Sequence, residues 1–182
     1  MTTFFTADLH LGHARIIQMC SRPFVDIDAM NRGLIERWNA VVGDDDDVHV
    51  IGDFAYRIGG KPLWAMFNEL RGRKHLTLGN HDGKDTLRLP WASPPEHRRH
   101  IADGDIVLDH YAGRTWYRSN RKSIQLYGHS HGRLPGNDQS LDVGVDAWDY
   151  RPVSLPEIRA RLATLPPFHY EEEPLAGEGF KP

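Results

Sequence analysis

Short apolar runs alternate with longer amphipathic stretches along the chain. Five runs rich in Val, Ile, Leu and Phe have the length of strands and end in turn residues, which predicts strands over residues 3–7, 47–51, 75–78, 105–108 and 123–127. Four stretches carry apolar residues at helical spacing, which predicts helices over residues 13–20, 28–42, 62–70 and 154–165. This alternation predicts an α/β fold.

A polar residue able to bind a metal follows each predicted strand. In chain order these residues are Asp8, Asp53, Asn80 with His81 and Asp82, His110, and His129 with His131. Open α/β sheets bind ligands beyond the carboxyl ends of their strands, so we expect these five strand ends to converge on one site.

Two of these strand ends carry ligand types two residues apart. Asp8 and His10 form one such pair, and His129 and His131 form the other. A strand has a side-chain period of two, so both members of a pair point to the same face. Each pair is a weak signal alone, but their ordered recurrence with the other strand ends indicates a metal site.

Composition narrows the class of protein. The chain has 182 residues, 40% hydrophobic and 26% charged, which predicts one folded, soluble domain over residues 1–170 and an acidic tail over 171–182. No apolar run is long enough to span a membrane, and the first residues lack the basic segment of a signal peptide, so we expect a cytoplasmic protein without a membrane partner. The net charge of −3 argues against a surface built to grip duplex DNA.

The cysteine and histidine content limits the metal chemistry. Cys20 is the single cysteine, which excludes an internal disulfide and a multi-cysteine zinc cluster, whereas the chain has 11 histidines. A metal must therefore be held by nitrogen and oxygen.

The ordered blocks DLH, GD, GNHD, a lone His and GHSH run from Asp8 to His131. In them the sequence resembles the calcineurin-like metallophosphoesterases, and the stretch DLHLGH is similar to a compact bacterial and phage-type branch of that superfamily. The resemblance implies a four-layer α/β/β/α sandwich of two mixed β-sheets flanked by helices.

The resemblance also implies a centre of two divalent metal ions. Asp8, His10 and His131 would hold one ion, Asn80, His110 and His129 the other, and Asp53 would bridge them. Manganese is the expected metal, with iron, zinc, nickel and cobalt compatible with the same ligands. His81 would be the catalytic residue, acting on the leaving-group oxygen as general acid or stabiliser.

The function so implied is hydrolysis of phosphate esters by a hydroxide that bridges the two metals. We expect a slight lean to phosphodiesters, because only Arg57 and Arg22 are placed to neutralise the extra charge of a monoester dianion. A nuclease or a nucleotide phosphodiesterase, including one for cyclic nucleotides, is the alternative enzyme, and its partner would be a nucleotide or single-stranded nucleic acid. The non-enzymatic alternative is an interaction scaffold on the same fold. The oligomeric state stays open.

The sequence departs from the protein phosphatases of the superfamily at Tyr56, where they have an Asp that pairs with the catalytic His. Asp82 is one substitute partner for His81, and an unpaired histidine is the other reading. The candidate substrate contacts are Arg57, Arg22, His13 and Arg118. Arg118 belongs to a loop over residues 111–122 that mixes cations with aromatic residues, a composition suited to bases and phosphates.

Overall fold

The computed structural model describes residues 1–169, except for the side chain of Asp103. The acidic tail predicted over residues 171–182 lies outside the described residues. Two four-stranded mixed sheets form the centre of the molecule. The first sheet has the order β3-β2-β1-β8 and the second the order β4-β5-β6-β7. The strands of the first are β1 (Thr3–Thr6), β2 (Asp47–Ile51), β3 (Arg73–Thr77) and β8 (Val153–Ser154), and those of the second are β4 (Arg98–Ile101), β5 (Ile106–Asp109), β6 (Ile124–Tyr127) and β7 (Ser140–Asp142).

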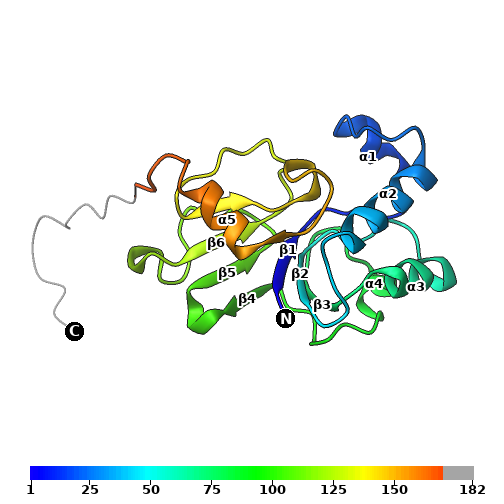
Figure 1. Cartoon of the computed structure of the whole chain (residues 1–182), viewed down its shortest axis with the longest axis horizontal. Coiled ribbons are helices and arrows are strands. Elements are labelled where there is room, and N and C mark those ends of the chain that lie inside the picture. The colour runs from blue at the N-terminus through cyan, green and yellow to red at the C-terminus, as the bar shows by residue number, and fades with distance from the viewer. Residues whose placement is uncertain (170–182) are drawn as a thin grey trace, which may run out of the picture.

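The two sheets have the same pattern of strand directions. Three neighbouring strands are parallel in each sheet, and one edge strand, β8 or β4, is antiparallel. Because parallel strands end at the same edge, each sheet carries its carboxyl-terminal loops on one side. Figure 1 shows β1 and β2 beside the second sheet, at the centre of the molecule.

Five helices connect and flank the strands. They are α1 (Ala14–Met19), α2 (Ile27–Asn39), α3 (Gly60–Glu69), α4 (Lys84–Leu87) and α5 (Leu155–Leu162). Short 3₁₀ turns follow at η1 (Ala102–Gly104), η2 (Ser119–Arg121) and η3 (Val145–Ala147). Helix α2 starts at Asp26, whose carboxylate accepts the amide of Ala29 at 2.7 Å, and α5 starts with a capping box in which Glu157 accepts the amide of Ser154 at 2.9 Å.

Successive residues of β1 serve two separate cores. Phe4 packs into a cluster with Val48 and Val50 of β2 and with side chains of α2 and α3, such as Trp38 and Phe67. The neighbouring Phe5 packs instead with residues of the second sheet and of α5, among them Leu108, Leu126 and Ile158. The alternation follows from the period of two of a strand. One face of the first sheet therefore packs on α2 and α3, and the other face packs on the second sheet and α5.

The predicted α/β fold with two mixed sheets is confirmed. All five predicted strands and all four predicted helices exist, with ends that differ by at most three residues. The sequence did not predict strands β4, β7 and β8 or helix α4. Strand β4 has the sequence RRHI, and β7 and β8 are only three and two residues long. These strands are too charged or too short to show the apolar alternation from which a strand is predicted. None of the helices among the described residues combines the length and apolarity that a membrane crossing requires.

Candidate metal centre

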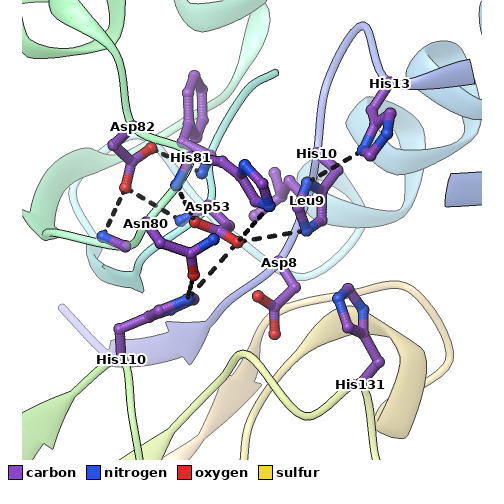
Figure 2. A network of polar contacts seen from close by, with 12 residues as sticks. Asp8, Leu9, His10, His13, Asp53, Asn80, His81, Asp82, His110 and His131 are labelled. Atoms are coloured by element: carbon purple, nitrogen blue, oxygen red, sulfur yellow. Dashed lines mark hydrogen bonds and ion pairs between the residues drawn. The ribbon is translucent and has the colours of Figure 1, made fainter. Parts of the chain in front are cut away.

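The carboxyl ends of β1, β2, β3, β5 and β6 converge between the two sheets (Figure 2). Two groups of side chains that share no residue form there, each with ligand atoms within 4.8 Å of one another, and a third, Cys20, His131 and Asp146, shares His131 with the first. The first group is Asp8, His10 and His131, and the second is Asp53, His110 and His129. The structure therefore brings together six of the seven residues for which the sequence implied a metal role, and the seventh, Asn80, joins the second group through His110.

Asp53 lies between the two groups. Its Oδ2 atom is 3.5 Å from Nε2 of His10 and 3.5 Å from Nε2 of His110. The other oxygen, Oδ1, accepts the backbone amide of His81 at 2.8 Å. One carboxylate thus faces both groups while it also positions the segment that carries His81.

The first group contains buried polar atoms without a hydrogen-bond partner among the described residues. Both carboxylate oxygens of Asp8 and Nε2 of His10 are in this state, although each residue is at most 1% exposed. Burial raises the pKa of Asp8 to about 7 and lowers the pKa of His10 to about 3, so His10 is a neutral imidazole at neutral pH. An unsatisfied buried carboxylate is costly, and a cation would satisfy these atoms together. The residues present fit a divalent metal ion.

The second group has its histidine oriented by the backbone. Nδ1 of His110 lies 2.9 Å from the carbonyl of Ile51, so it donates there, and Nε2 turns toward Asp53 and toward Oδ1 of Asn80, 3.1 Å away. Burial opposes the charge of this pair, but the hydrogen bond between its members raises the pKa of His110 to about 9 and lowers the pKa of Asp53 to about 2. A carbonyl that fixes the outer nitrogen is the usual support of a metal-binding histidine.

The backbone adopts a left-handed conformation at five of these residues. The φ angles are +58° at Asp8, +52° at His10, +55° at Asp53, +63° at His129 and +50° at His131. Residues other than glycine rarely adopt this conformation and pay for it in stability, and such strain concentrates at functional sites. The left-handed residues bend the backbone after each strand, so that alternate side chains point into the centre.

Glycine allows the close approach of the chains. Gly52 has a φ of +84°, and a side chain there would collide with the ring of His110. A Cβ atom at Gly128 would lie 2.8 Å from Oδ2 of Asp8. The glycines of the GD and GHSH blocks are thus required by the packing of the two groups against each other.

Arg22 is not a substrate contact, which corrects the expectation from sequence. Its side chain is fully buried and its guanidinium donates twice to Asp146, at 2.8 Å each, and to the carbonyls of Leu9 and Asp8 at 2.9 and 2.7 Å. Arg22 therefore holds the backbone at the end of β1.

Asp82 does not pair with His81. Its carboxylate accepts three backbone amides, those of Asp53 at 3.0 Å, Phe54 at 3.0 Å and Gly79 at 2.8 Å (Figure 2). It thereby ties the loop after β2 to the loop after β3. The expectation that Asp82 substitutes for the missing partner is wrong because all its contacts are with the backbone.

Beyond Tyr111, the loop over residues 111–122 leads away from the centre. Arg118 pairs with Asp105, 3.4 Å away, which precedes β5, whereas His110 follows the same strand at its other end. The Trp116 side chain is buried, and its indole donates to the carbonyl of Ser123 at 3.0 Å. The structure thus places Arg118 at the end of β5 opposite to His110, and its contact with substrate stays a prediction. Trp116 offers no exposed face for stacking.

His13, Tyr56, Arg57 and His81 gather beside the first group. The rings of His13 and Tyr56 are 4.0 Å apart, Tyr56 meets His81 edge-on at 4.9 Å, and the guanidinium of Arg57 is 5.0 Å from the Tyr56 ring. Nε2 of His81 lies 4.0 Å from Oδ2 of Asp53. The expected contacts at His13 and Arg57 are therefore near the centre, and His81 lies between them and Asp53.

Sequence reasoning missed two residues of the centre. Asp146 accepts Nδ1 of His131 at 2.7 Å. Tyr111 places its hydroxyl 3.2 Å from Oδ1 of Asn80 and its ring 4.6 Å from that of His129. The position of Tyr111 directly after His110 was a usable signal. Asp146 is 124 residues from Arg22 and had none.

The fold and these side chains define an α/β sandwich protein with a candidate site for two cations at the shared edge of its sheets. No family model matches the chain. It is 31% identical to the gene 66 protein of Mycobacterium phage D29, over 86% of this chain and 93% of that protein. The chain belongs to the family of these phage gene 66 proteins.

Two further relatives and one solved structure are similar to this chain. The chain is 29% identical to the gene 66 protein of Mycobacterium phage L5 over 86% of its length and 91% of that protein, and 28% identical to the uncharacterized protein MJ1445 of Methanocaldococcus jannaschii over 84% and 86%. The crystal structure of the protein of unknown function AQ665 from Aquifex aeolicus covers 88% of this chain and 98% of that one, with a TM-score of 0.67 and 21% identity. That likeness concerns the fold alone.

Proposed function

We propose that this protein is a metal-dependent phosphoesterase of the calcineurin-like class. The observation that carries the proposal is the Asp53 carboxylate, which lies 3.5 Å from a histidine nitrogen of each of two ligand groups. The unpartnered oxygens of Asp8 support it, because a buried carboxylate with raised pKa and no donor needs a cation.

The seven residues would share two cations between them. Asp8, His10 and His131 would hold one, Asn80, His110 and His129 the other, with Asp53 between them. Manganese is the metal we expect, and iron, zinc, nickel and cobalt suit the same nitrogen and oxygen donors. Two bound cations would supply charge neutralisation at a phosphoryl oxygen and a water of lowered pKa.

The residues around the ligands would complete the reaction. His81 would donate a proton to the leaving-group oxygen from Nε2, the nitrogen that faces Asp53. Its backbone amide, held by Asp53, would keep the histidine next to the cations. Arg57 would contact a phosphoryl oxygen or the leaving group.

We propose phosphodiesters as the preferred substrates. A monoester dianion needs more positive charge around its free oxygens than a diester monoanion does. Arg22 has its donors committed to Asp146 and to two carbonyls, and Arg118 pairs with Asp105, so Arg57 is the candidate near the centre among the three arginines expected from sequence. The basic loop, which favoured a nuclease, has its Trp116 buried and Arg118 turned to Asp105.

Calorimetric titration with Mn²⁺, followed by hydrolysis assays on bis(4-nitrophenyl) phosphate and 4-nitrophenyl phosphate, tests the proposal. We expect two bound ions per chain and turnover that requires them. Asp8→Asn should lose the ion of the first group, and turnover with it. Asp105→Asn, an exposed aspartate at the other end of β5, is the matched control and should keep both. Two bound ions without turnover of any phosphate ester would favour the scaffold alternative. A monoester preference above about tenfold in kcat/KM would contradict the preference for diesters.

A further inference from the structure

A cavity of about 400 Å³ opens beside His81, between α1 and the loop after β2. We call it the ring pocket. Its lining includes His13, Arg15, Met19, Tyr56, Arg57 and His81. This cavity contains no ligand residue of either group, so the metal centre itself does not account for it.

The lining of the ring pocket is aromatic, apolar and cationic. The rings of His13 and Tyr56, tilted by 34° and 4.0 Å apart, form one part, and Met19, which is 57% exposed, adds a thioether to the lining. Arg15 and Arg57 supply positive charge, and the lining includes no acidic residue. Flat rings pack well on aromatic and thioether groups, and the arginines favour an adjacent negative charge.

A neighbouring cavity on the other side of Arg57 differs in character. It has a volume of about 320 Å³ and includes Lys84, Asp85 and Thr86 but no aromatic ring other than His81. A ring would therefore gain more in the ring pocket than in this second cavity.

The position of His81 decides which part of a substrate would enter. Its ring lines the pocket, and its Nε2 atom faces Asp53 at 4.0 Å. If His81 serves the leaving-group oxygen, the group bonded to that oxygen extends past the histidine. The ring pocket is the apolar space on this route.

We infer that the ring pocket is the subsite for the leaving-group arm of a phosphodiester, and that it takes an arm carrying a flat aromatic or heteroaromatic ring. The inference rests on the proposed function, since it names the part of the substrate that leaves. Tyr56, His13 and Met19 bind the ring, and Arg57 lies at the phosphate end of the arm.

Two aryl diesters distinguish the leaving arm from the retained arm. In methyl 4-nitrophenyl phosphate the leaving arm is the aromatic one, whereas bis(4-nitrophenyl) phosphate has a ring on both arms. We expect Tyr56→Ala to raise KM about tenfold for both esters, with kcat changed less than KM, because ring stacking of this kind is worth about a factor of ten or more. A rise for the bis ester alone would overturn the assignment to the leaving arm, and no rise for either would overturn the pocket.

A second variant guards against an indirect effect through His81, which Tyr56 contacts. Met19→Gln changes the other wall of the pocket at an exposed position and should raise KM for both esters in the same direction. Tyr117→Ala is the matched control, because this tyrosine is 56% exposed and stacks on His100, away from the pocket. An unchanged KM in Met19→Gln together with a large fall of kcat in Tyr56→Ala would mean that Tyr56 acts only on His81, which overturns the inference.

Binding without metal separates this inference from the proposed function. Saturation-transfer NMR with 4-nitrophenol and chelated, metal-free protein should detect contact with the ring of the ligand, and the signal should fall in Tyr56→Ala and Met19→Gln but persist in Tyr117→Ala. Absence of that signal in the unmodified protein overturns the ring pocket. Absence of ester hydrolysis in manganese-loaded protein overturns the proposed function and with it the leaving-arm assignment, while a retained NMR signal would still establish a ring-binding cavity.

Discussion

Nδ1 of His131 lies 2.7 Å from Oδ2 of Asp146, and the same carboxylate accepts the buried guanidinium of Arg22 at 2.8 Å. Although burial opposes the ionised form, the hydrogen bonds from these two side chains lower the pKa of Asp146. The carboxylate occupies Nδ1 of His131 and leaves Nε2 as the nitrogen for a cation. Such outer carboxylates orient metal-binding histidines and are worth about 10- to 100-fold in metal affinity.

Asp146→Asn should therefore weaken Mn²⁺ binding by about 10- to 100-fold, because an amide holds the His131 ring less well than a carboxylate. Calorimetry on the folded variant measures this. Asp149→Asn, at an exposed aspartate that pairs with Arg37, is the matched control and should bind as the unmodified protein does. Equal affinities in the two variants would contradict the role of Asp146.

Asp53→Asn should reduce metal binding and turnover more than a change at any ligand that serves one cation. The carboxylate faces His10 and His110 at the same distance, so its loss weakens both groups and removes the charge between two cations. We expect loss of metal occupancy and of turnover together, measured by elemental analysis after dialysis and by diester hydrolysis. Retention of two ions with a near-normal rate would disprove this.

His81→Ala should keep both cations and lose about 10²- to 10⁴-fold in kcat if His81 donates a proton. The loss should be smaller for a 4-nitrophenyl ester, whose leaving group departs without that proton, than for an alkyl ester. His97→Ala, at an exposed position, is the control. An equal loss for both leaving groups would mean that His81 positions the ester or stabilises charge instead.

Arg22→Met should destabilise the protein by about 3–5 kcal/mol, because it leaves the buried carboxylate of Asp146 without the guanidinium of Arg22. Denaturant unfolding of the metal-free protein measures the change. The exposed pair of Arg37 and Asp149 gives the matched control, since Arg37→Met should cost no more than about 1 kcal/mol. A loss in Arg22→Met as small as that in Arg37→Met would show that the buried pair contributes little.

The histidine at position 49 should make stability depend on pH. His49 is buried against Phe5 and His75, and burial lowers its pKa to about 4. Between about pH 6.5 and pH 4 the unfolded chain binds a proton at this residue that the folded protein does not, so the free energy of unfolding falls as the pH falls. The contribution is on the order of 2–3 kcal/mol at the acidic end.

Unfolding midpoints of metal-free protein across this range, compared with those of His49→Gln, isolate that contribution. We expect a flatter pH dependence in the variant and an unchanged one in His97→Gln, whose side chain is exposed. Parallel curves for the unmodified protein and His49→Gln would refute the assignment.

The apolar periodicity of the sequence was enough to predict the strands that end at the centre. Strands β1 and β2 are rich in apolar residues and are each followed by a candidate metal ligand, Asp8 or Asp53. These two residues converge because parallel strands end at the same edge of the sheet. Short or charged elements such as β4 and β7 lacked this signal, since pairing with a neighbouring strand, not their own residues, makes them strands.

What surrounds the ligands depended on contacts between segments far apart in the sequence. Arg22 and Arg118 looked alike as candidate substrate contacts. Arg22 is buried in an ion pair with Asp146, however, and Arg118 pairs with Asp105 at the end of β5 opposite to His110. Asp82 lies next to His81 in sequence but points at backbone amides of two loops. The types of the candidate ligands and their order could be read from the sequence because each follows its own strand. Their supports, and the pocket beside His81, could not, because each requires the packed positions of segments that share no local pattern.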